Sequence, residues 1–592
     1  MAYVGVTWDH PSGAALLEGE SIVAAVSEER YSRKKNDGTF PKHSLDYLRK
    51  TLAGAAIDCV GVASMQPSYA HLLLQYHTFS VRDMVAEQNR YWYPKVYENK
   101  TVDIVDALAE KCVHDQYPAD YWAGYAKEKQ LTFPDDSRKI IANYLEIPEN
   151  RVLRFDHHLC HALYAYYGSP FRDEKALVIT VDGSGDGLNA TVSIAENGTI
   201  KRIYETDKCI IGRVYSHVTL LLGMKRLEHE YKVMGLAPYG NREDAQGVFD
   251  ILNSFIDVEG IEFVWKAKPK DSYFQLQKQL EGYRFDLIAA GMQRWVEELL
   301  AKWTANLVRE TKIATLVLSG GVSMNVKAMG VLAQLPEVER MHVPGSGADE
   351  TTCIGAAIAV SQFSNGGKLV NPVTVPNLYL GADTEQEDID AVGKMAAGMS
   401  ELVVTVAPTS ADVARLLAKG CVIGRCIGRM EFGQRSLGNR AILADPTATD
   451  LVANINTMIK HRDFWMPFAP VVLDTYAERY LINPKGIQSP QMTVAFPTTE
   501  IGYASMRAAC HPADKTARAQ ILQEADNPEL YELLLEFEKC TGHGSLLNTS
   551  FNLHGFPIVQ TAQDAFDVFM NSGLEGLWLR GLLIVKEQAA AH

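Results

Sequence analysis

A chain of 592 residues is too long for one ordinary hydrophobic core, so we expect two or three domains. Hydrophobic residues make up 47% and charged residues 22%, which indicates a folded globular protein and excludes a disordered one. The net charge of -15 argues against a broad nucleic-acid surface. No apolar run is long enough to cross a bilayer, and nine cysteines without a Cys-x-x-Cys pair do not indicate a disulfide framework. We therefore expect a reduced, cytoplasmic protein with no nucleic-acid or membrane partner.

The first predicted elements form a hairpin. Residues 3–8 and 14–17 have the composition of strands and are separated by a polar turn that contains His10, and a third strand follows at 21–26. A turn of this kind begins domains of the actin and sugar-kinase type, where it faces the nucleotide, and an ordinary β-meander is the alternative. The charge-rich run 28–35 is expected to be a solvated face.

The next region differs in composition from the rest of the chain. Residues 66–140 are rich in Tyr, Trp, His and charge, with helical spacing and few strand signals. We predict a helical insertion here. One hypothesis is that this insertion covers a site where a small molecule binds. The other is that it only packs against the rest of the domain.

Two short motifs then offer metal ligands. His157 and His161 are four residues apart, so on a helix both imidazoles leave the same face. Further along, an apolar run ends at Asp182 in a glycine-rich turn. The pattern lacks the glutamate that makes His-Glu-x-x-His specific. A metal site and a hydrogen-bonded pair of core histidines therefore both remain open.

More strands and helices follow in alternation. A hairpin is predicted at 191–195 and 200–205, and a long amphipathic helix at 288–309. A buried strand at 314–318 leads into Ser-Gly-Gly, and a helix begins soon after. Glycines and helix-start N–H groups there favour an anion, although many such turns only join a strand to a helix. Asp349 is a second acid that follows a strand.

A Gly- and Pro-rich break sets the predicted domain boundary. Residues 366–376 contain Gly-Gly, Asn-Pro and Val-Pro and are the best linker candidate. We place the first domain at 1–365 and the second at 377–592.

The C-terminal third contains a local excess of positive charge. Between residues 424 and 463 six basic residues stand against four acids, in a chain that is acidic overall. Arginine suits phosphate because it bonds bidentately, so a polyphosphate pocket competes with surface ion pairs as the interpretation. Segments 516–520 and 547–552 add clustered hydroxyls and amides typical of ligand loops. The six basic residues are Arg425, Arg429, Arg435, Arg440, Lys460 and Arg462.

Several of these motifs, in unchanged order from the first strand to about residue 575, resemble the O-carbamoyltransferase family of nodulation and antibiotic biosynthesis. The matching segments are residues 10–15 (HPSGAA), 156–162 (DHHLCHA), 232–240 (KVMGLAPYG), 431–440 (EFGQRSLGNR), 467–470 (PFAP) and 548–552 (NTSFN).

The resemblance implies a fold and a reaction. It implies an α/β N-terminal domain like Kae1, of the actin/Hsp70/sugar-kinase superfold, and an α+β C-terminal domain like YrdC. In such proteins the YrdC-like half makes carbamoyl adenylate from ATP and carbamoyl phosphate. The Kae1-like half passes the carbamoyl group to a hydroxyl. ATP, carbamoyl phosphate and a small hydroxylated natural product, from secondary-metabolite, antibiotic or toxin biosynthesis, are thus the expected partners, and a homodimer is left open.

The resemblance also assigns residues. His10 matches the catalytic histidine, with general base as its expected role. The expected ligands of Fe²⁺ or a similar divalent metal are His157, His161, Asp182 and Asp349. Carbamoyl adenylate would be held by Ser319, Gly320, Gly321 and Asn325. ATP with Mg²⁺ and carbamoyl phosphate would be held by Arg429, Arg435, Lys460, Arg462, Arg518, Asn548, Ser550 and Asn552.

Two departures and two alternatives accompany this assignment. Pro11 stands where the family usually has Asp, and Met466 where many relatives carry Arg, and we interpret both as marks of a subgroup. A tRNA carbamoyl- or threonylcarbamoyl-transfer enzyme is the first alternative, opposed by the net charge and the lack of a basic face. A non-catalytic ATP-binding scaffold is the second, opposed by the presence of His10 and all four metal ligands.

Overall fold

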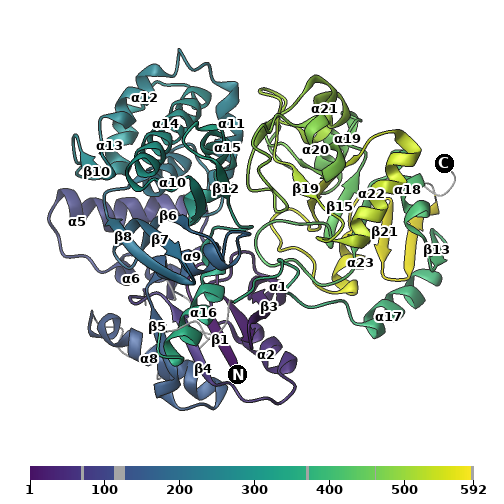
Figure 1. Cartoon of the computed structure of the whole chain (residues 1–592), viewed down its shortest axis with the longest axis horizontal. Helices are drawn as coiled ribbons and strands as arrows, with labels where there is room; N and C mark the ends of the chain where they lie inside the picture. Colours follow the sequence, from purple (N-terminus) through teal and green to yellow (C-terminus); the bar gives the residue numbers. More distant parts are fainter. Residues whose placement is uncertain (69–72, 113–126, 368–372, 461, 588–592) are drawn as a thin grey trace. The chain divides into compact units, whose positions relative to one another are not determined.

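The computed structural model describes residues 1–68, 73–112, 127–367, 373–460 and 462–587 (Figure 1). The chain divides into two compact units, Met1–Pro376 and Asn377–His592, and each of them mixes helices with β-sheet. None of the helices in these described ranges has the length and apolar character needed to span a membrane.

The first sheet of the first unit has the strand order β3-β2-β1-β4-β5. Strand β1 (Ala2–Thr7) pairs antiparallel with β2 (Gly13–Glu18) and parallel with β4 (Cys59–Ala63). The hairpin expected at the N-terminus is therefore present. The outer strands are β3 (Ser21–Ser27) and β5 (Val152–Phe155).

The second sheet repeats this topology. Its order is β12-β11-β6-β7-β8, with β6 (Ala176–Gly185) antiparallel to β7 (Leu188–Glu196) and parallel to β11 (Thr315–Ser319). The edge strands are β8 (Thr199–Thr206) and β12 (Arg340–His342). Because β6 and β11 run parallel, their carboxyl ends meet at one edge of the sheet.

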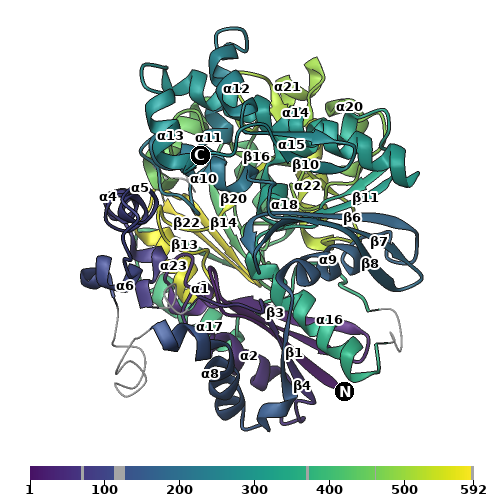
Figure 2. The same cartoon turned by 90° about the vertical axis from the view of Figure 1, so that its left-hand side faces the viewer.

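Two helices link these sheets. Figure 2 shows α9 (His157–Tyr167) and α16 (Thr352–Ser364) side by side. Glycines allow the close contacts of α16. A Cβ on Gly355 would lie 1.9 Å from the carbonyl oxygen of Cys160, and a Cβ on Gly5 would lie 1.8 Å from the carbonyl oxygen of Cys353. The first unit also contains α1 (Glu29–Ser32), α2 (Lys42–Thr51), α10 (Ile211–Leu221), α11 (Glu230–Leu236), α12 (Gln246–Asn253), α13 (Ser272–Gln279), α14 (Phe285–Thr311) and α15 (Val326–Gln334).

The described part of segment 66–140 is helical. Ser80 begins α4 with a capping box, its hydroxyl accepting from the Asp83 N–H while the Asp83 carboxylate accepts from the Ser80 N–H. Residues 69–72 and 113–126 lie outside the described ranges. The helices are α4 (Val81–Glu87), α5 (Tyr93–Tyr97), α6 (Ile104–Ala107) and α8 (Lys127–Leu145), with a π-turn at Gln88–Trp92.

The expectation of a solvated face at 28–35 is wrong for part of the run. Glu28 and Arg30 are buried. The Glu28 carboxylate accepts hydrogen bonds at the start of α2, from the His43 N–H at 3.0 Å and from the Ser44 N–H at 2.9 Å. The charge is buried because it satisfies helix-start N–H groups that have no partner within the helix.

The second unit is built on an eight-stranded sheet of order β13-β22-β21-β14-β15-β20-β16-β19. Neighbouring residues Leu546 and Leu547 of one strand belong to separate apolar cores, so both faces of the sheet are covered. The strands are β13 (Leu402–Val406), β14 (Ile423–Cys426), β15 (Arg440–Ala444), β16 (Ala469–Leu473), β19 (Gln520–Leu522), β20 (Ser545–Ser550), β21 (Gly576–Leu579) and β22 (Leu582–Lys586). The main helices are α17 (Gln386–Ala397), α18 (Ser410–Ala418), α22 (Pro528–Thr541) and α23 (Ala562–Met570).

Candidate metal centre and anion site

Four side chains from three parts of the first unit converge on one point. The Nε2 atom of His161 lies 3.1 Å from His157 Nε2, 3.1 Å from Asp182 Oδ2 and 3.2 Å from Asp349 Oδ1. One ligand atom from each of the four residues lies within 4.8 Å of every other. The structure thus brings together the four residues that the resemblance assigned to a metal.

Local structure explains this convergence. His157 and His161 are one turn apart on α9, whose first turn is capped by the Asp156 carboxylate accepting from the Leu159 N–H at 2.7 Å. Asp182 is the last residue of the buried run of β6, and Asp349 begins a short 3-10 turn before α16. The neighbouring His158 faces elsewhere, with its Nδ1 2.8 Å from the Thr180 hydroxyl.

The ionisable groups of the cluster perturb one another strongly. Burial disfavours the charged ring of His157, but the nearby Asp349 and the hydrogen-bonded Asp182 outweigh it and raise its pKa to about 10. Burial together with the Asp182 charge raises the pKa of Asp349 to about 6. The two imidazoles hold the pKa of Asp182 well below its usual range, against the effect of burial.

The donor set fits a first-row divalent ion. Two imidazole nitrogens and two carboxylate oxygens are the ligands that such ions take in proteins, and a four-ligand set leaves positions for substrate or water. Two carboxylates buried this closely repel each other, and a cation between them removes that repulsion. No residue needs to move far, since all the ligand atoms already face one another.

Two polar residues hold the histidines from behind. The Ser319 hydroxyl lies 3.3 Å from His161 Nδ1, the ring nitrogen that faces away from the cluster. The Asp186 carboxylate accepts from the His157 N–H at 2.8 Å, and also from the Ser64 hydroxyl and the Met65 N–H at 2.9 and 2.8 Å. Asp186 therefore joins the start of α9 to the end of the first sheet. Such supporting contacts orient metal-binding histidines. No pattern in the sequence indicates this role for Ser319 or Asp186.

The predicted adenylate-binding turn is present, but its side chains have internal partners. Gly320 has φ 92°, and a Cβ there would lie 2.2 Å from the Val181 carbonyl oxygen. Gly321 begins a 3-10 turn next to Asp182. The Asn325 side chain caps α15 and exchanges two hydrogen bonds of 2.9 Å with the Gln293 amide. What this turn offers a ligand is consequently its backbone.

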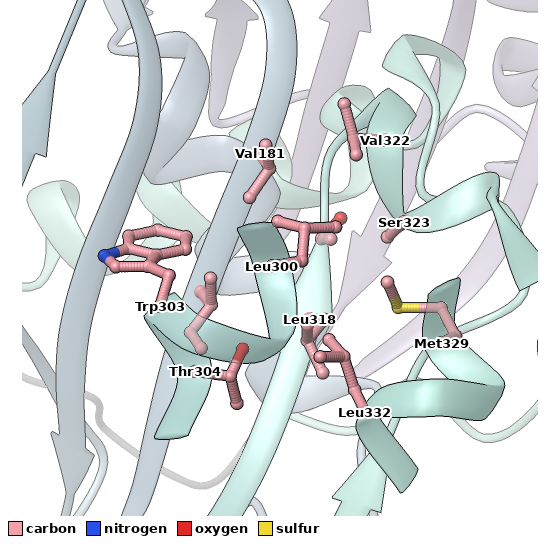
Figure 3. Close-up of a pocket in the computed structure, with 11 residues that line it drawn as sticks. Val181, Leu300, Trp303, Thr304, Leu318, Val322, Ser323, Met329 and Leu332 are labelled. Carbon is pink, nitrogen blue, oxygen red and sulfur yellow. The ribbon is translucent and has the colours of Figure 1, made fainter. Parts of the chain in front are cut away.

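A small cavity lies behind the turn (Figure 3). Its walls come from α14, α15, β6 and β11, and Figure 3 shows Trp303, Leu318 and Leu332 among the side chains around it. The lining is almost entirely apolar, so the cavity belongs to the core that supports the site and does not suit a charged ligand.

His10 lies in the turn between β1 and β2 and is half-buried. Its peptide bond to Pro11 is cis. The turn packs against the segment that follows β3, where the Ser12 N–H donates to the Asp37 carbonyl oxygen at 2.8 Å. His10 is not a member of the four-residue cluster.

In the second unit, the structure divides the basic residues into two groups. The first group is structural. Arg429 donates to the carbonyl oxygens of Gly381 and Leu380 at 3.0 and 2.6 Å. Fully buried Arg440 donates to five backbone carbonyls, and fully buried Arg425 contacts Gly438, Asn439 and Glu529.

The second group consists of three arginines that are near enough for the charges of two of them to act on the third. They are Arg435, Arg462 and Arg518, and we call them the arginine cluster. Burial and the charges of Arg435 and Arg462 hold the pKa of Arg518 well below its usual range. No acid contributes to that shift. Guanidinium groups placed near one another could bind an anion, because each offers several N–H donors to phosphate oxygens.

The end of β20 and the two residues that follow it carry hydroxyls and amides, and they contact Arg462 of the arginine cluster. Arg462 donates to the Thr549 hydroxyl at 3.1 Å. Buried Lys460 donates to the Ser550 hydroxyl at 3.2 Å and to Asn552 Oδ1 at 2.9 Å. The Asn552 amide donates in turn to the carbonyls of Leu553 and Phe556. Lys460 and Asn552 therefore hold the end of β20 and the turn after it in place.

Comparison with known proteins gives two matching family models. The model described as Carbamoyltransferase N-terminus matches residues 3–358, and that described as Carbamoyltransferase C-terminus matches residues 414–586. An uncharacterised protein of Synechocystis sp. is 30% identical and is matched over 98% of this chain and 95% of its own. Nodulation protein NolNO of Sinorhizobium fredii is 27% identical and is matched over 99% of this chain and 80% of its own. Nodulation protein NolO of Bradyrhizobium diazoefficiens is 31% identical and is matched over 74% of this chain and 79% of its own.

Solved structures resemble the chain only distantly. Component A of the (R)-2-hydroxyglutaryl-CoA dehydratase of Acidaminococcus fermentans is 15% identical, covers 62% of this chain and 100% of its own, and has a TM-score of 0.32. Full-length HypF is 12% identical, covers 62% and 56%, and has the same TM-score. With TM-scores this low, the solved structures say little about this chain, and its family is given by the matching family models.

Proposed function

Because the chain belongs to the carbamoyltransferase family, we propose that it is an ATP-dependent O-carbamoyltransferase that acts on a hydroxyl of a small natural product. The observation that carries this proposal is the convergence of His157, His161, Asp182 and Asp349 within 4.8 Å. A protein that only bound ATP or served as a scaffold would not need two imidazoles and two carboxylates buried at one point. The arginine cluster of the second unit supports the ATP-dependent half of the reaction.

The second unit makes carbamoyl adenylate in the first half-reaction. Carbamoyl phosphate takes up one water and releases phosphate, and an oxygen of the resulting carbamate attacks the α-phosphorus of ATP and expels pyrophosphate. Arg435, Arg462 and Arg518 neutralise the phosphate charges that meet there, and Mg²⁺ bound to ATP would supply further positive charge. Residues 548–552, at the end of β20 and just after it, orient the substrate beside them. Arg429 and Lys460 act indirectly, by holding the loops that border the site.

The first unit transfers the carbamoyl group in the second half-reaction. The acceptor oxygen attacks the carbamoyl carbon, and AMP leaves with the electrons of the broken C–O bond. His10 takes the proton of the hydroxyl, a task for which imidazole is the usual side chain. Backbone N–H groups of residues 319–321 orient the adenylate at the end of β11. A divalent ion such as Fe²⁺, held by the two histidines and two aspartates, would supply Lewis-acid polarisation there.

The test is mass spectrometry on the purified chain with ATP, carbamoyl phosphate and a panel of hydroxylated metabolites, with and without Fe²⁺. We expect one acceptor to gain a single carbamoyl group, with AMP and pyrophosphate formed in equal amounts. AMP without a carbamoylated product would mean that the panel lacks the acceptor. Folded protein that forms no AMP from ATP in the presence of carbamoyl phosphate would favour the scaffold alternative.

A further inference from the structure

A buried carboxylate closes the loop that carries Arg435. Glu431 is 1% exposed. Its Oε1 accepts hydrogen bonds from three backbone N–H groups further along the chain, those of Leu437 and Asn439 at 2.8 Å and that of Arg440 at 3.1 Å. One side-chain oxygen thus joins the start of segment 431–440 to its end, and Arg435 lies between them. We call this segment the Glu431 loop.

The Glu431 loop has a specific backbone shape. Gly433 has φ 100° and Gly438 has φ 115°, values that residues with a side chain rarely adopt, so both positions depend on glycine. Every residue of the loop is buried except Gln434 and Arg435. The rest of the loop is therefore packed into the unit, while these two side chains reach outward.

Buried arginines make the charge of Glu431 tolerable. A buried carboxylate without an opposite charge nearby is costly. Arg440 is fully buried and supplies one of the three N–H groups, and fully buried Arg425 donates to the Asn439 side-chain oxygen at 2.8 Å. The second carboxylate oxygen of Glu431, Oε2, is buried and has no hydrogen-bond donor among the described residues. The hydrogen bonds of this carboxylate in the described part of the chain are therefore all to the loop backbone.

The arginine cluster needs a restraint of this kind. Burial and the charges of Arg435 and Arg462 lower the pKa of Arg518, and like charges so close to one another repel. Without a restraint, the loop would move Arg435 away from the other two arginines. Hydrogen bonds to an ionised carboxylate are about twice as strong as those between neutral groups, so Glu431 can hold the loop against this repulsion. An anion would then meet a site that is already formed.

We propose that Glu431 is a positioning residue for the adenylate-forming reaction, which closes the Glu431 loop and so holds Arg435 where phosphate oxygens bind. The inference rests on the proposed function, which assigns phosphate binding to the arginine cluster. A purely structural role of Glu431 would differ in one respect. Only a positioning role requires that the effect of a substitution on phosphate binding pass through Arg435.

The experiment measures the affinity of the full chain for pyrophosphate with Mg²⁺ by isothermal titration calorimetry. Arg435→Ala should weaken binding by about 10- to 100-fold, because hydrogen bonds between charged groups are lost. Glu431→Gln has nearly the same volume but no charge, and it should weaken binding by about 3- to 10-fold. Glu575→Gln is the matched control, because Glu575 also accepts from a backbone N–H, that of Val422 at 2.8 Å, but lies outside the loop. Its affinity should equal that of the wild type.

A double variant with Glu431→Gln and Arg435→Ala distinguishes positioning from a general effect on the fold. If Glu431 acts through Arg435, the double variant should bind pyrophosphate as Arg435→Ala does, within about 2-fold. Losses that multiply in the double variant would show that the two residues act independently, and they would overturn the inference.

A second pair of variants covers the case in which Glu431→Gln does not fold. Gly433→Ala places a side chain where φ is 100°, so the loop should shift beside Arg435 and pyrophosphate binding should weaken. Gly420→Ala is the control, since Gly420 has a similar φ of 94° and a Cβ there meets nothing within 4 Å. It strains a turn outside the loop and should leave the affinity unchanged. Wild-type affinity in Gly433→Ala would overturn the inference.

The outcomes separate the inference from the function on which it rests. Wild-type affinity in folded Glu431→Gln, together with weaker binding in Arg435→Ala, would overturn the inference and leave the phosphate site intact. Wild-type affinity in Arg435→Ala would remove this arginine from the proposed function, and the inference with it.

Discussion

His161 touches every other member of the four-residue cluster. Its Nε2 lies within 3.2 Å of His157, Asp182 and Asp349, and Ser319 lies behind its other ring nitrogen. No other imidazole of the chain is placed in this way among the described residues. The proposed metal centre therefore depends most on this one ring.

Replacement of His161 by Ala should abolish tight metal binding. The variant loses one of four ligands and leaves two carboxylates with a single imidazole. The measurement is metal content by elemental analysis after anaerobic loading with Fe²⁺, followed by titration. His158→Gln is the matched control, since His158 lies on the same helix but faces Thr180. A His161→Ala protein with wild-type iron content and affinity would show that the cluster is not the metal centre.

His10→Ala tests the proposed proton acceptor. The variant should lose carbamoyl transfer by several orders of magnitude, because general bases contribute about 10²–10⁴-fold. Its pyrophosphate release with carbamoyl phosphate should be unchanged, since that reaction belongs to the other unit. Single-turnover assays of both half-reactions make the comparison. Transfer at the wild-type rate would remove the general-base assignment.

Helix α16 connects the two sheets of the first unit to α9, the helix that carries His157 and His161. It packs against β1 and α9 at backbone distance, as the glycine contacts at Gly5 and Gly355 show. The same helix follows directly on the turn that begins with Asp349. The position of α9 relative to Asp349 is thus set by how closely these two helices approach.

Gly355→Ala should destabilise the first unit and disturb the metal centre together. The new Cβ would lie 1.9 Å from the Cys160 carbonyl oxygen, so α9 and α16 must separate. We expect a loss of about 1–3 kcal/mol and weaker iron binding. Thermal unfolding with and without iron measures both effects. Gly183→Ala, where a Cβ meets nothing within 4 Å, is the control. Equal melting temperatures for Gly355→Ala and the wild type would contradict the packing argument.

Strands and turns could be predicted from the sequence more reliably than the contacts of individual charged side chains. The hairpin at residues 3–17 and the turn after β11 follow from local patterns of apolar and glycine residues. The partners of charged side chains did not follow from the sequence. Glu28 is buried at a helix start, and Arg429 donates to backbone carbonyls, because segments distant in sequence supply the groups they meet.

The meeting of the four side chains of the cluster was also only partly predictable from the sequence. His157, His161 and Asp182 stand in two nearby motifs whose spacing suggests a ligand set. Asp349 came from the family resemblance, because nothing local ties it to residues so far back in the chain. The roles of Asp186 and Ser319 depend on side-chain distances that no sequence pattern reports.

For the whole molecule, buried neutral histidines should limit stability in acid. Burial lowers the pKa of His217 to about 3 and that of His342 to about 4, both from 6.5. The unfolded chain therefore binds protons first as the pH falls below about 6.5, and each group costs up to about 1.4 kcal/mol per pH unit until its folded pKa is reached. Stability should be fully present above pH 6.5 and decline below it.

The melting temperature measured between pH 7.5 and pH 4.5 checks this expectation. His342→Gln cannot titrate, so its melting temperature should fall less with acid than that of the wild type. An equal or steeper fall in the variant would show that His342 does not contribute to acid sensitivity.

The most direct test of the central claim is ATP–pyrophosphate exchange, with carbamoyl phosphate as the variable. We expect exchange that requires carbamoyl phosphate, persists in His10→Ala and disappears in Arg435→Ala. Arg507→Ala, an exposed arginine of the same unit, should exchange like the wild type. Exchange that ignores carbamoyl phosphate, or that survives in Arg435→Ala, would contradict an adenylate-forming site at the arginine cluster.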